Sequence, residues 1–267
     1  MKQAPVQKIQ LTRTQQGQTN KVADLLVVEA PLEIRLAGPA GPFQSWTVSM
    51  RTPGQDMELA AGLLYHESVI QQLEDIILID FCQNVSRPEA VGNVLNVRLA
   101  FSPPESTRRI QSTASCGVCG KASIEAALAC QTQLIRQDIP LLDADWIIRI
   151  PDMVQKAQTL FAHTGGIHAA ALFAPNGEVL MLREDIGRHN ALDKLVAAAL
   201  GKNVSLTTSV LFLSGRVGFE LVQKSLVAGI PAIVAVGAPS SLAVEMSRTA
   251  GQQLIGFVRE DRFNHYT

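Results

Sequence analysis

Two cysteines three positions apart, Cys116 and Cys119, have the side chains and spacing best suited to chemistry. Residues 122–129 are rich in helix formers, which predicts that the pair lies at the start of a helix. The positive end of a helix dipole and its free N–H groups stabilise a thiolate. Gly117 and Gly120 leave the backbone open beside both sulfurs. The pattern therefore favours nucleophilic sulfur that a second protein's persulfide or a bulky cofactor can approach.

Three other interpretations of the cysteine pair stay open at this point. The pair can be half of a zinc site completed by His163 and His168, although the long intervening segment does not match a zinc finger. It can be a thioredoxin-like dithiol, although that motif normally follows the first strand of a small βαβ domain. It can also be an inert structural pair. Cys82 and Cys130 are expected to be packed core thiols.

A second polar cluster lies between an expected strand and an expected helix, in the run Glu184-Asp185-Ile186-Gly187-Arg188-His189-Asn190-Ala191-Leu192-Asp193-Lys194. Arg188 and His189 are suited to binding phosphate or assisting proton transfer, with Asp185 orienting them. The alternative is an ordinary helix N-cap by Asn190 with charges in solvent. The residues alone favour neither interpretation.

The last part of the chain alternates strands and helices, which predicts a parallel βαβαβ sheet. The expected strands are 210–213, 232–236 and 254–258, and the expected helices are 220–228 and 242–250. Ligands bind outside the carboxyl ends of such strands, where Arg216, Arg259 and Arg262 fall. Arginine grips phosphate well, although these three can also be solvated. No Rossmann or P-loop glycine motif occurs, so neither nucleotide site is supported.

These residues are carried by a chain that we expect to be α/β, or α+β overall, in three parts. Residues 1–22 are Gln/Thr-rich without periodicity and predict a flexible arm. Residues 23–107 predict a smaller, mixed, β-rich part, and a polar, proline-containing stretch marks its end. Residues 108–267 form the larger part. The further expected elements are strands 25–36, 43–50, 76–81 and 94–101, helix 57–64, a helix through Met153, Ala157, Leu160 and Phe161, a hairpin of 169–173 with 179–182, and helix 190–200.

Composition excludes several classes of function. Lys and Arg total 23 against 24 Asp and Glu, and the formal net charge of −1 gives no support for nucleic-acid binding. Hydrophobic residues make up 47% of 267 positions, enough for a stable core without disulfides. The polar first residues and the lack of a long apolar run argue against secretion and membrane spanning. We therefore expect a cytoplasmic protein with reduced thiols.

Several short segments occur in an ordered set that is far more specific than any one of them. They are Thr52-Pro53-Gly54-Gln55-Asp56-Met57-Glu58-Leu59-Ala60, Cys116-Gly117-Val118-Cys119-Gly120, Gly165-Gly166-Ile167-His168-Ala169-Ala170, the run from Glu184 to Lys194, Ser214-Gly215-Arg216, Gly256-Phe257-Val258-Arg259 and Arg262-Phe263-Asn264-His265-Tyr266. The set resembles the FdhD family of formate dehydrogenase accessory sulfurtransferases, from about Val27 to the end of the chain.

The resemblance implies that a cysteine desulfurase loads sulfur onto the CxxC segment as a persulfide. The persulfide then sulfurates a bound bis-molybdopterin guanine dinucleotide molybdenum cofactor, which is cargo for formate dehydrogenase. It also implies a homodimer, no resident metal, and a cytidine-deaminase-like fold for residues 108–267. Deaminase chemistry is not expected, because H-x-E must precede P-C-x-x-C, whereas His168 follows the cysteines and lacks the glutamate.

Residue roles follow from the same resemblance. Cys116 is expected to carry the persulfide, and Cys119 to relay sulfur or assist. The residues expected to bind the cofactor are Phe257, Val258, Arg259, Glu260, Asp261, Arg262, Ser214, Gly215, Arg216 and His189. One local departure is Gly237-Ala238-Pro239-Ser240-Ser241, where the family usually has Ser-Ala-Pro-Thr-Ser. Two other functions stay open: a cofactor-binding chaperone whose cysteines only shape the loop, and a zinc-clasped adaptor.

Overall fold

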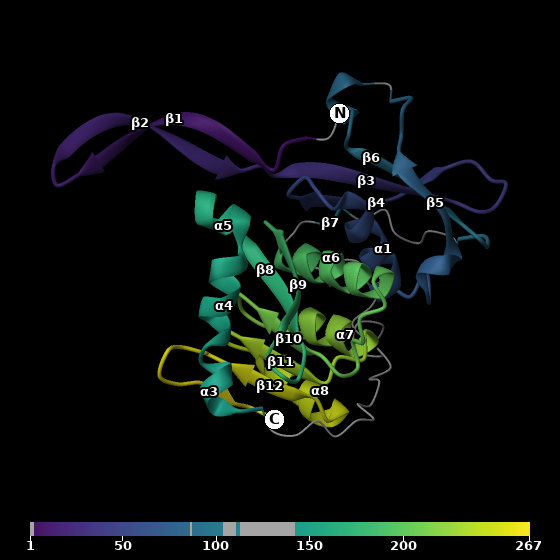
Figure 1. Cartoon of the computed structure of the whole chain (residues 1–267). Coiled ribbons are helices and arrows are strands. Elements are labelled where there is room, and N and C mark those ends of the chain that lie inside the picture. Colours follow the sequence, from purple (N-terminus) through teal and green to yellow (C-terminus); the bar gives the residue numbers. More distant parts are fainter. Residues whose placement is uncertain (1–2, 86, 104–110, 113–141) are drawn as a thin grey trace.

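The computed structural model describes residues 3–85, 87–103, 111–112 and 142–267. These residues form a two-stranded hairpin, a five-stranded sheet and a six-stranded sheet, with helices packed on the two larger sheets (Figure 1). The chain is therefore a mixed α/β protein, as predicted. The cysteine pair, the helix expected after it, and the boundary expected between residues 107 and 108 lie outside the described residues.

The six-stranded sheet has the order β13-β12-β11-β10-β8-β9. Its strands are β8 (His168–Phe173), β9 (Val179–Asp185), β10 (Val210–Leu213), β11 (Ala232–Ala235), β12 (Gln253–Gly256) and β13 (Asn264–His265). Strands β10, β11 and β12 are parallel, whereas β8 runs antiparallel to both β10 and β9. Helices α7 (Phe219–Val227) and α8 (Ser241–Ala250) connect the parallel strands. The βαβαβ order and the predicted hairpin before it are confirmed. The expectation of a mostly parallel sheet is wrong, because β8 pairs antiparallel with β9 and β10, and β13 pairs antiparallel with β12.

Helices cover both faces of this sheet, so its central strands are apolar on both sides. Helix α6 (Arg188–Gly201) lies with α7 and α8 on one face, and α3 (Ala144–Ile147), α4 (Ile150–Ala157) and α5 (Thr159–Thr164) lie on the other (Figure 1). Strand β10 shows the consequence. Leu211 and Leu213 pack in the core beneath α6 and α7, whereas Val210 and Phe212 pack in the core beneath α3 and α4.

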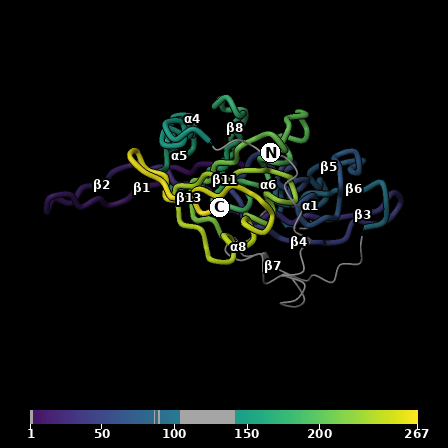
Figure 2. Tube along the Cα trace, turned by 90° about the horizontal axis from the view of Figure 1, so that it is seen from below, coloured from purple at the N-terminus to yellow at the C-terminus, as the bar shows by residue number. Residues whose placement is uncertain are grey.

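The five-stranded sheet belongs to the N-terminal part and has the order β5-β6-β3-β4-β7. Its strands are β3 (Ala30–Ala37), β4 (Gln44–Arg51), β5 (Ile76–Phe81), β6 (Val94–Leu99) and β7 (Gln111–Ser112), and two 3₁₀ turns, η1 (Leu73–Asp75) and η2 (Pro88–Ala90), flank β5 and β6. Helix α1 (Asp56–His66) packs its Leu59 and Leu64 against Leu32 and Ile34 of β3. Its other side lies beside α6, and both views show this contact between the two parts (Figures 1 and 2).

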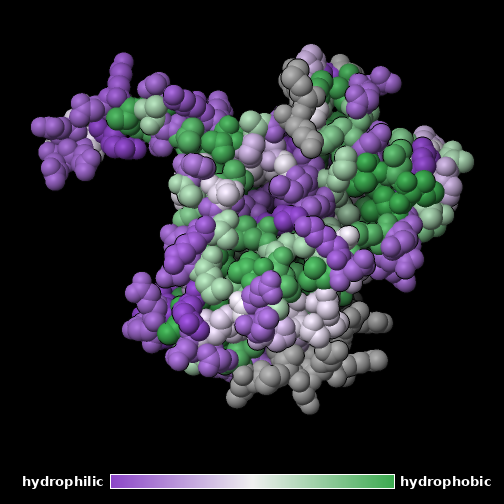
Figure 3. Space-filling model, viewed as in Figure 1, coloured by the Kyte–Doolittle hydropathy of each residue, from purple (hydrophilic) through white to green (hydrophobic). Residues whose placement is uncertain are grey.

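The N-terminal arm corrects our expectation of an unstructured segment. Strands β1 (Val6–Gln15) and β2 (Gln18–Val27) pair along their whole length as an antiparallel hairpin that projects from the body (Figure 2). Gln16 and Gly17 form the turn with φ values of 52° and 79°, as a two-residue hairpin loop requires. The expected strand 25–36 is therefore the end of β2 followed by β3. The hairpin surface is largely hydrophilic, with apolar patches near its middle and its base (Figure 3).

A second correction concerns the helix expected through residues 153–161. The helix ends at Ala157 and a new one begins at Thr159, because Gln158 adopts an extended backbone with ψ of 107°. Gly165 closes α5 with φ of 66°, in the left-handed conformation expected of a glycine after a helix. Across the described residues, no helix is long and apolar enough to cross a membrane.

Candidate functional site

The carboxyl ends of β10, β11 and β12 meet at one edge of the six-stranded sheet. The N–H of Gly237 donates to the carbonyl of Gly215 at 3.2 Å, and the N–H of Phe257 donates to the carbonyl of Gly237 at 3.2 Å. A Cβ added to Gly237 would lie 2.5 Å from the Gly215 carbonyl oxygen, so only glycine allows this approach. A serine at this position would force these strand ends apart.

A cavity of about 500 Å³ lies between the ends of β10 and β11 and helices α4 and α5. Its lining residues are Pro151, Gln155, Gln158, Phe161, Gly165, Gly166, Ile167, His168, Ile186, Phe212, Ser214 and Val236. The lining combines apolar and aromatic walls with a few polar groups, which is the usual make-up of a small-molecule site. The structure thus places a cavity where the strand order predicted a ligand site.

His168 and Ser214 are polar residues of this cavity that lie at the strand ends. The Ser214 hydroxyl accepts from the N–H of Ala169 at 2.9 Å, which ties β8 to the end of β10. The ring of His168 lies over Gly215, where an added Cβ would be 3.3 Å from the ring. Burial, and then the charge of Arg188, lower the pKa of His168. At neutral pH this imidazole is uncharged and can both donate and accept a hydrogen bond.

The closing segment forms a turn beside this edge. The N–H of Arg259 donates to the carbonyl of Arg262 at 2.8 Å, and the Arg259 guanidinium donates to the carbonyls of Val236 and Val258 at 2.8 Å each. The Val258 side chain is fully buried, so only its backbone can meet a ligand. Phe257 has φ of 54° and a ring that is 41% exposed. The other expected contacts are exposed side chains: Arg216, Glu260, Asp261 and Arg262.

His189 lies away from the cavity lining, among polar groups that are buried or partly buried. Its Nε2 is 3.5 Å from Glu220, and Lys224 lies 2.6 Å from both oxygens of Asp193. Burial, then Lys224 and Arg188, lower the pKa of His189 to about 3. The geometry resembles an ion pair, but an imidazole with so low a pKa is neutral at pH 7. His189 is therefore suited to hydrogen bonding rather than to providing positive charge.

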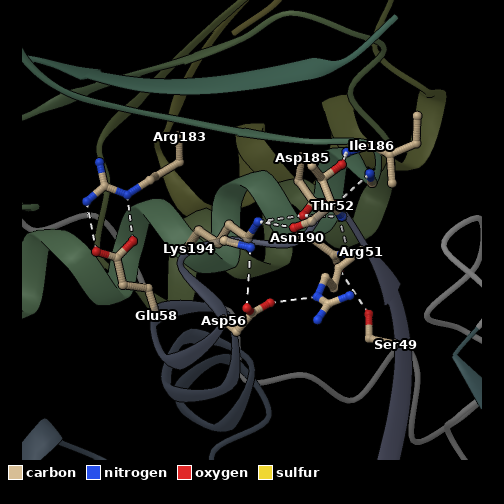
Figure 4. Close-up of polar contacts among 12 residues, drawn as sticks. Ser49, Arg51, Thr52, Asp56, Glu58, Arg183, Asp185, Ile186, Asn190 and Lys194 are labelled. Carbon is tan, nitrogen blue, oxygen red and sulfur yellow. Dashed lines mark hydrogen bonds and ion pairs between the residues drawn. The ribbon is translucent and has the colours of Figure 1, made fainter. Parts of the chain in front are cut away.

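The run that begins at Glu184 mainly joins the two parts of the molecule (Figure 4). One oxygen of the Asp185 carboxylate accepts from the N–H of Thr52 at 3.1 Å, and Lys194 lies 2.7 Å from the same oxygen. Lys194 also donates to the carbonyl of Thr52 at 3.0 Å, and the amide of Asn190 donates to the carbonyl of Met50 at 2.7 Å. Asp185 and Lys194 have no exposed surface. Burial raises the pKa of Asp185, while Lys194 opposes that shift.

Both earlier interpretations of this run need correction for Asp185 and Asn190. Neither side chain is solvated, and the N-cap of α6 is Gly187 rather than Asn190. The sequence alone did not indicate that residues 49–52 of β4 and its following turn are the partners. The only available indication was that the Thr52-Pro53-Gly54 segment and this run belong to the same set of motifs on which the family resemblance rests.

Glu184 is a buried residue that sequence reasoning did not single out individually. Its carboxylate accepts from the backbone N–H groups of Leu160 and Phe161, both at 2.9 Å, and from the side chains of Gln158 and Thr159 at 3.3 and 3.4 Å. The acceptor therefore sits at the start of α5, the helix that carries Phe161 into the cavity. The sequence did hold one indication of this role. Successive residues of a strand point to opposite faces, so Glu184 and Asp185 at the end of β9 had to have different partners.

No group of three or more His, Cys, Asp or Glu side chains that could hold a metal occurs within the part of the chain that the structure describes. Cys116 and Cys119 lie outside it, so this finding does not test the zinc interpretation. His163 is exposed on α5, and Cys82 is a partly buried free thiol after β5.

Comparison with known proteins identifies the family of the chain. The model of the FdhD/NarQ family matches residues 27–267. The chain belongs to the FdhD/NarQ family. A relative from Mycobacterium bovis, named sulfur carrier protein FdhD, is 46% identical over 253 residues, which cover 91% of this chain and 90% of the relative. A relative of the same name from Sulfolobus acidocaldarius is 36% identical over 263 residues, covering 98% and 96%.

The FdhD/NarQ fold agrees with a solved structure. A crystal structure of a protein described as a formate dehydrogenase accessory protein, from Desulfotalea psychrophila, matches with a TM-score of 0.73. It is 22% identical and covers 99% of this chain and 97% of its own, so the likeness supports the fold alone. The resemblance stated from the sequence motifs is confirmed. The FdhD/NarQ match starts at residue 27, so it takes in both larger sheets but not the hairpin before them.

Proposed function

We propose that this protein is a sulfur carrier that serves formate dehydrogenase maturation through a persulfide on Cys116. The observation that carries the proposal is the likeness, at 46% identity over most of the chain, to proteins named as sulfur carriers. The Cys116 thiolate attacks the outer sulfur of a cysteine desulfurase persulfide, and the desulfurase thiolate leaves. The outer sulfur then passes to the cargo, and the Cys116 thiolate is regenerated. Cys119 relays the sulfur or assists this release.

We further propose that the cargo is the bis-molybdopterin guanine dinucleotide molybdenum cofactor, bound at the strand-end edge. The cavity can take a planar ring system, since its walls include Phe161 and Phe212. Exposed Arg216, Arg259 and Arg262 can meet phosphates. The homodimer and the cytidine-deaminase-like description of residues 108–267 stay predictions of the same resemblance.

Mass spectrometry of the intact protein tests the carrier role directly. Wild type, Cys116→Ala and Cys119→Ala are each incubated with a cysteine desulfurase and cysteine. We expect the wild type to gain sulfur in a form that a reductant removes, and Cys116→Ala to gain none. Cys82→Ala is the matched control and is expected to behave as the wild type. Loss of sulfur only in Cys119→Ala would give that residue the leading role, and no sulfur gain in any form would refute the carrier function.

Two alternatives give different results in the same set of proteins. A cofactor chaperone with passive cysteines would support dehydrogenase maturation equally well as wild type and as Cys116→Ala. A zinc-clasped adaptor would hold about one tightly bound zinc per chain and unfold on chelation. Metal analysis of protein purified without added zinc separates the adaptor from the other two.

A further inference from the structure

We propose that Glu184 is a positioning residue that shapes the strand-end cavity by holding helix α5 in place. The inference rests on the proposed function, because it assigns a role in cargo binding. Glu184 is only 7% exposed and lies at the end of β9, a strand fixed in the sheet by its pairing with β8. Its carboxylate is thus an acceptor fixed at the end of an edge strand of the six-stranded sheet.

Helix α5 depends on this acceptor because it lacks a cap of its own. The helix has six residues, and its N-cap residue Gln158 makes no capping hydrogen bond with its side chain. The first N–H groups of a helix have no partner within the helix and need one from elsewhere. The N–H groups of Leu160 and Phe161 are those that an N-cap side chain normally satisfies, and Glu184 satisfies both.

The position of α5 decides the shape of the cavity. Gln158 before it, Phe161 within it, and Gly165 and Gly166 after it all line that space. The helix is too short to be stable alone, and its far end leads into two consecutive glycines. With Glu184 holding one end, α5 forms a wall. Without Glu184, this wall would move away from the ends of β10 and β11, and the cavity would lose one side.

The two residues that follow Glu184 also contact neighbouring parts of the molecule. Asp185 binds the turn at Thr52, and Ile186 lines the cavity directly. Three consecutive residues thus contact α5, the N-terminal part and the cavity. Glu184 acts on the ligand only through α5, since the cavity lining does not include it.

Binding of guanosine diphosphate, the nucleotide end of the proposed cargo, tests the inference by calorimetry. Glu184→Gln keeps the size of the side chain but offers one acceptor oxygen instead of two. We expect its affinity to fall by about fivefold to tenfold, the effect of losing a helix cap when only the capped form binds. Glu178→Gln, on the exposed turn of the same hairpin, is the matched control and is expected to bind as the wild type.

A local cap separates positioning from a general loss of stability. Gln158→Asp in the Glu184→Gln background places an acceptor at the N-cap of α5, within reach of the same two N–H groups. Because Gln158 also lines the cavity, its own effect on affinity is measured in the single variant Gln158→Asp, and we expect the double variant to bind within about twofold of that single variant. Hydrogen exchange across residues 159–164 should be faster in Glu184→Gln and slow again in the double variant. Glu184→Asp, which keeps the charge, serves as the second variant should Glu184→Gln not fold.

The possible outcomes separate the positioning role of Glu184 from the proposed cargo site. Unchanged affinity in Glu184→Gln and in Glu184→Asp would overturn the positioning role while leaving cargo binding intact. Slow exchange regained in the double variant, with an affinity still well below that of Gln158→Asp alone, would also overturn it, because α5 would then be in place without effect. A wild type that binds no guanosine diphosphate would refute the proposed cargo site itself, and with it this inference.

Discussion

Three imidazoles in this structure are kept neutral by their surroundings. Burial is the main reason that the pKa values of His66, His168 and His189 are all lowered. For His66, the hydrogen bond to Asp193 opposes the effect of burial without reversing it. Each imidazole therefore resists protonation in the folded protein and accepts it in the unfolded one. Acid favours the unfolded state through these residues.

His189 gives the clearest pH dependence, because its pKa falls from 6.5 to about 3. Below pH 6.5 the unfolded chain takes up a proton that the folded chain refuses until about pH 3. The stabilisation is complete above pH 6.5 and is lost as the pH falls toward 3, with a slope approaching about 1.4 kcal/mol per pH unit. In His189→Gln we expect the free energy of unfolding to fall less steeply between pH 6.5 and 4.5.

Urea denaturation at several pH values measures this slope. Exposed His265→Gln is the control and should keep the steep dependence of the wild type. Equal slopes in the wild type and His189→Gln would mean that His189 becomes protonated in the folded state as readily as in the unfolded one. Lys224 and Arg188, whose charges disfavour protonation, would then be the first contacts to re-examine.

At the scale of single residues, the sequence indicated which polar residues cluster better than it indicated which partners they contact. The run from Glu184 to Lys194 was recognised as a dense polar cluster, for which a functional role and an ordinary helix N-cap both stayed open. Yet Asp185 and Asn190 are buried in contacts with residues more than 130 positions earlier. No local pattern names such partners, because hydrogen bonds across two layers leave no periodicity. The position of the strand-end cavity was predictable, since it follows from the βαβαβ order.

Among the elements that the structure describes, α1 and α6 pack closely against each other at Gly62. A Cβ on Gly62 would lie 1.9 Å from the carbonyl oxygen of Asp193, a backbone atom that cannot move aside alone. Gly62→Ala must therefore push the helices apart. We expect it to lower the free energy of unfolding by about 3 kcal/mol or more. Thermal and urea denaturation against the wild type measure the loss.

Gly201→Ala, at the end of α6, is the matched control for this substitution. An added Cβ there meets its nearest atom, on Leu73, at an ordinary 3.6 Å. Alanine favours helix over glycine, so this variant should be as stable as the wild type or more stable by up to about 1 kcal/mol. If Gly62→Ala behaved like Gly201→Ala, the packing of α1 on α6 would be looser than the structure describes.

The elements that were mispredicted have two different physical causes. The hairpin β1–β2 is rich in Gln and Thr and has few large apolar residues, so composition suggested disorder although its turn residues suit a two-residue loop. The break between α4 and α5 was missed because apolar periodicity continues through Gln158. That break depends on Glu184, a distant acceptor that makes a new helix start favourable. The hairpin turn was thus a local signal that composition outweighed, whereas no local pattern reports a distant acceptor.

On the scale of the whole molecule, the two parts are joined by a polar contact as well as by the packing of α1 on α6. Lys194 is at its centre, since it neutralises Asp185 and binds the carbonyl of Thr52 where both groups are buried. Removing one partner of a buried ion pair leaves the other charge without compensation, which costs about 3–5 kcal/mol. Because the lost free energy comes from the contact between the two parts, the substitution should let the parts unfold separately rather than destabilise each part internally.

The two tryptophans of the chain allow this to be measured, because Trp46 lies in the N-terminal sheet and Trp146 packs under the six-stranded sheet. Trp146→Phe and Trp46→Phe each leave one reporter. With Lys194 in place, we expect the fluorescence of both tryptophans and the circular dichroism signal to change at the same urea concentration, as for one cooperative unit. Lys194→Met should destabilise the protein and let the Trp46 signal change at lower urea than the Trp146 signal.

The control is the double variant Asp185→Asn, Lys194→Met, which removes both buried charges. It should recover part of the loss and bring the two fluorescence transitions back toward coincidence, since no charge is then left uncompensated. Coincident transitions in Lys194→Met itself would contradict the prediction. The packing of α1 on α6 would then be sufficient to hold the parts as one unit, and the ion pair would set the strength of the joint but not its cooperativity.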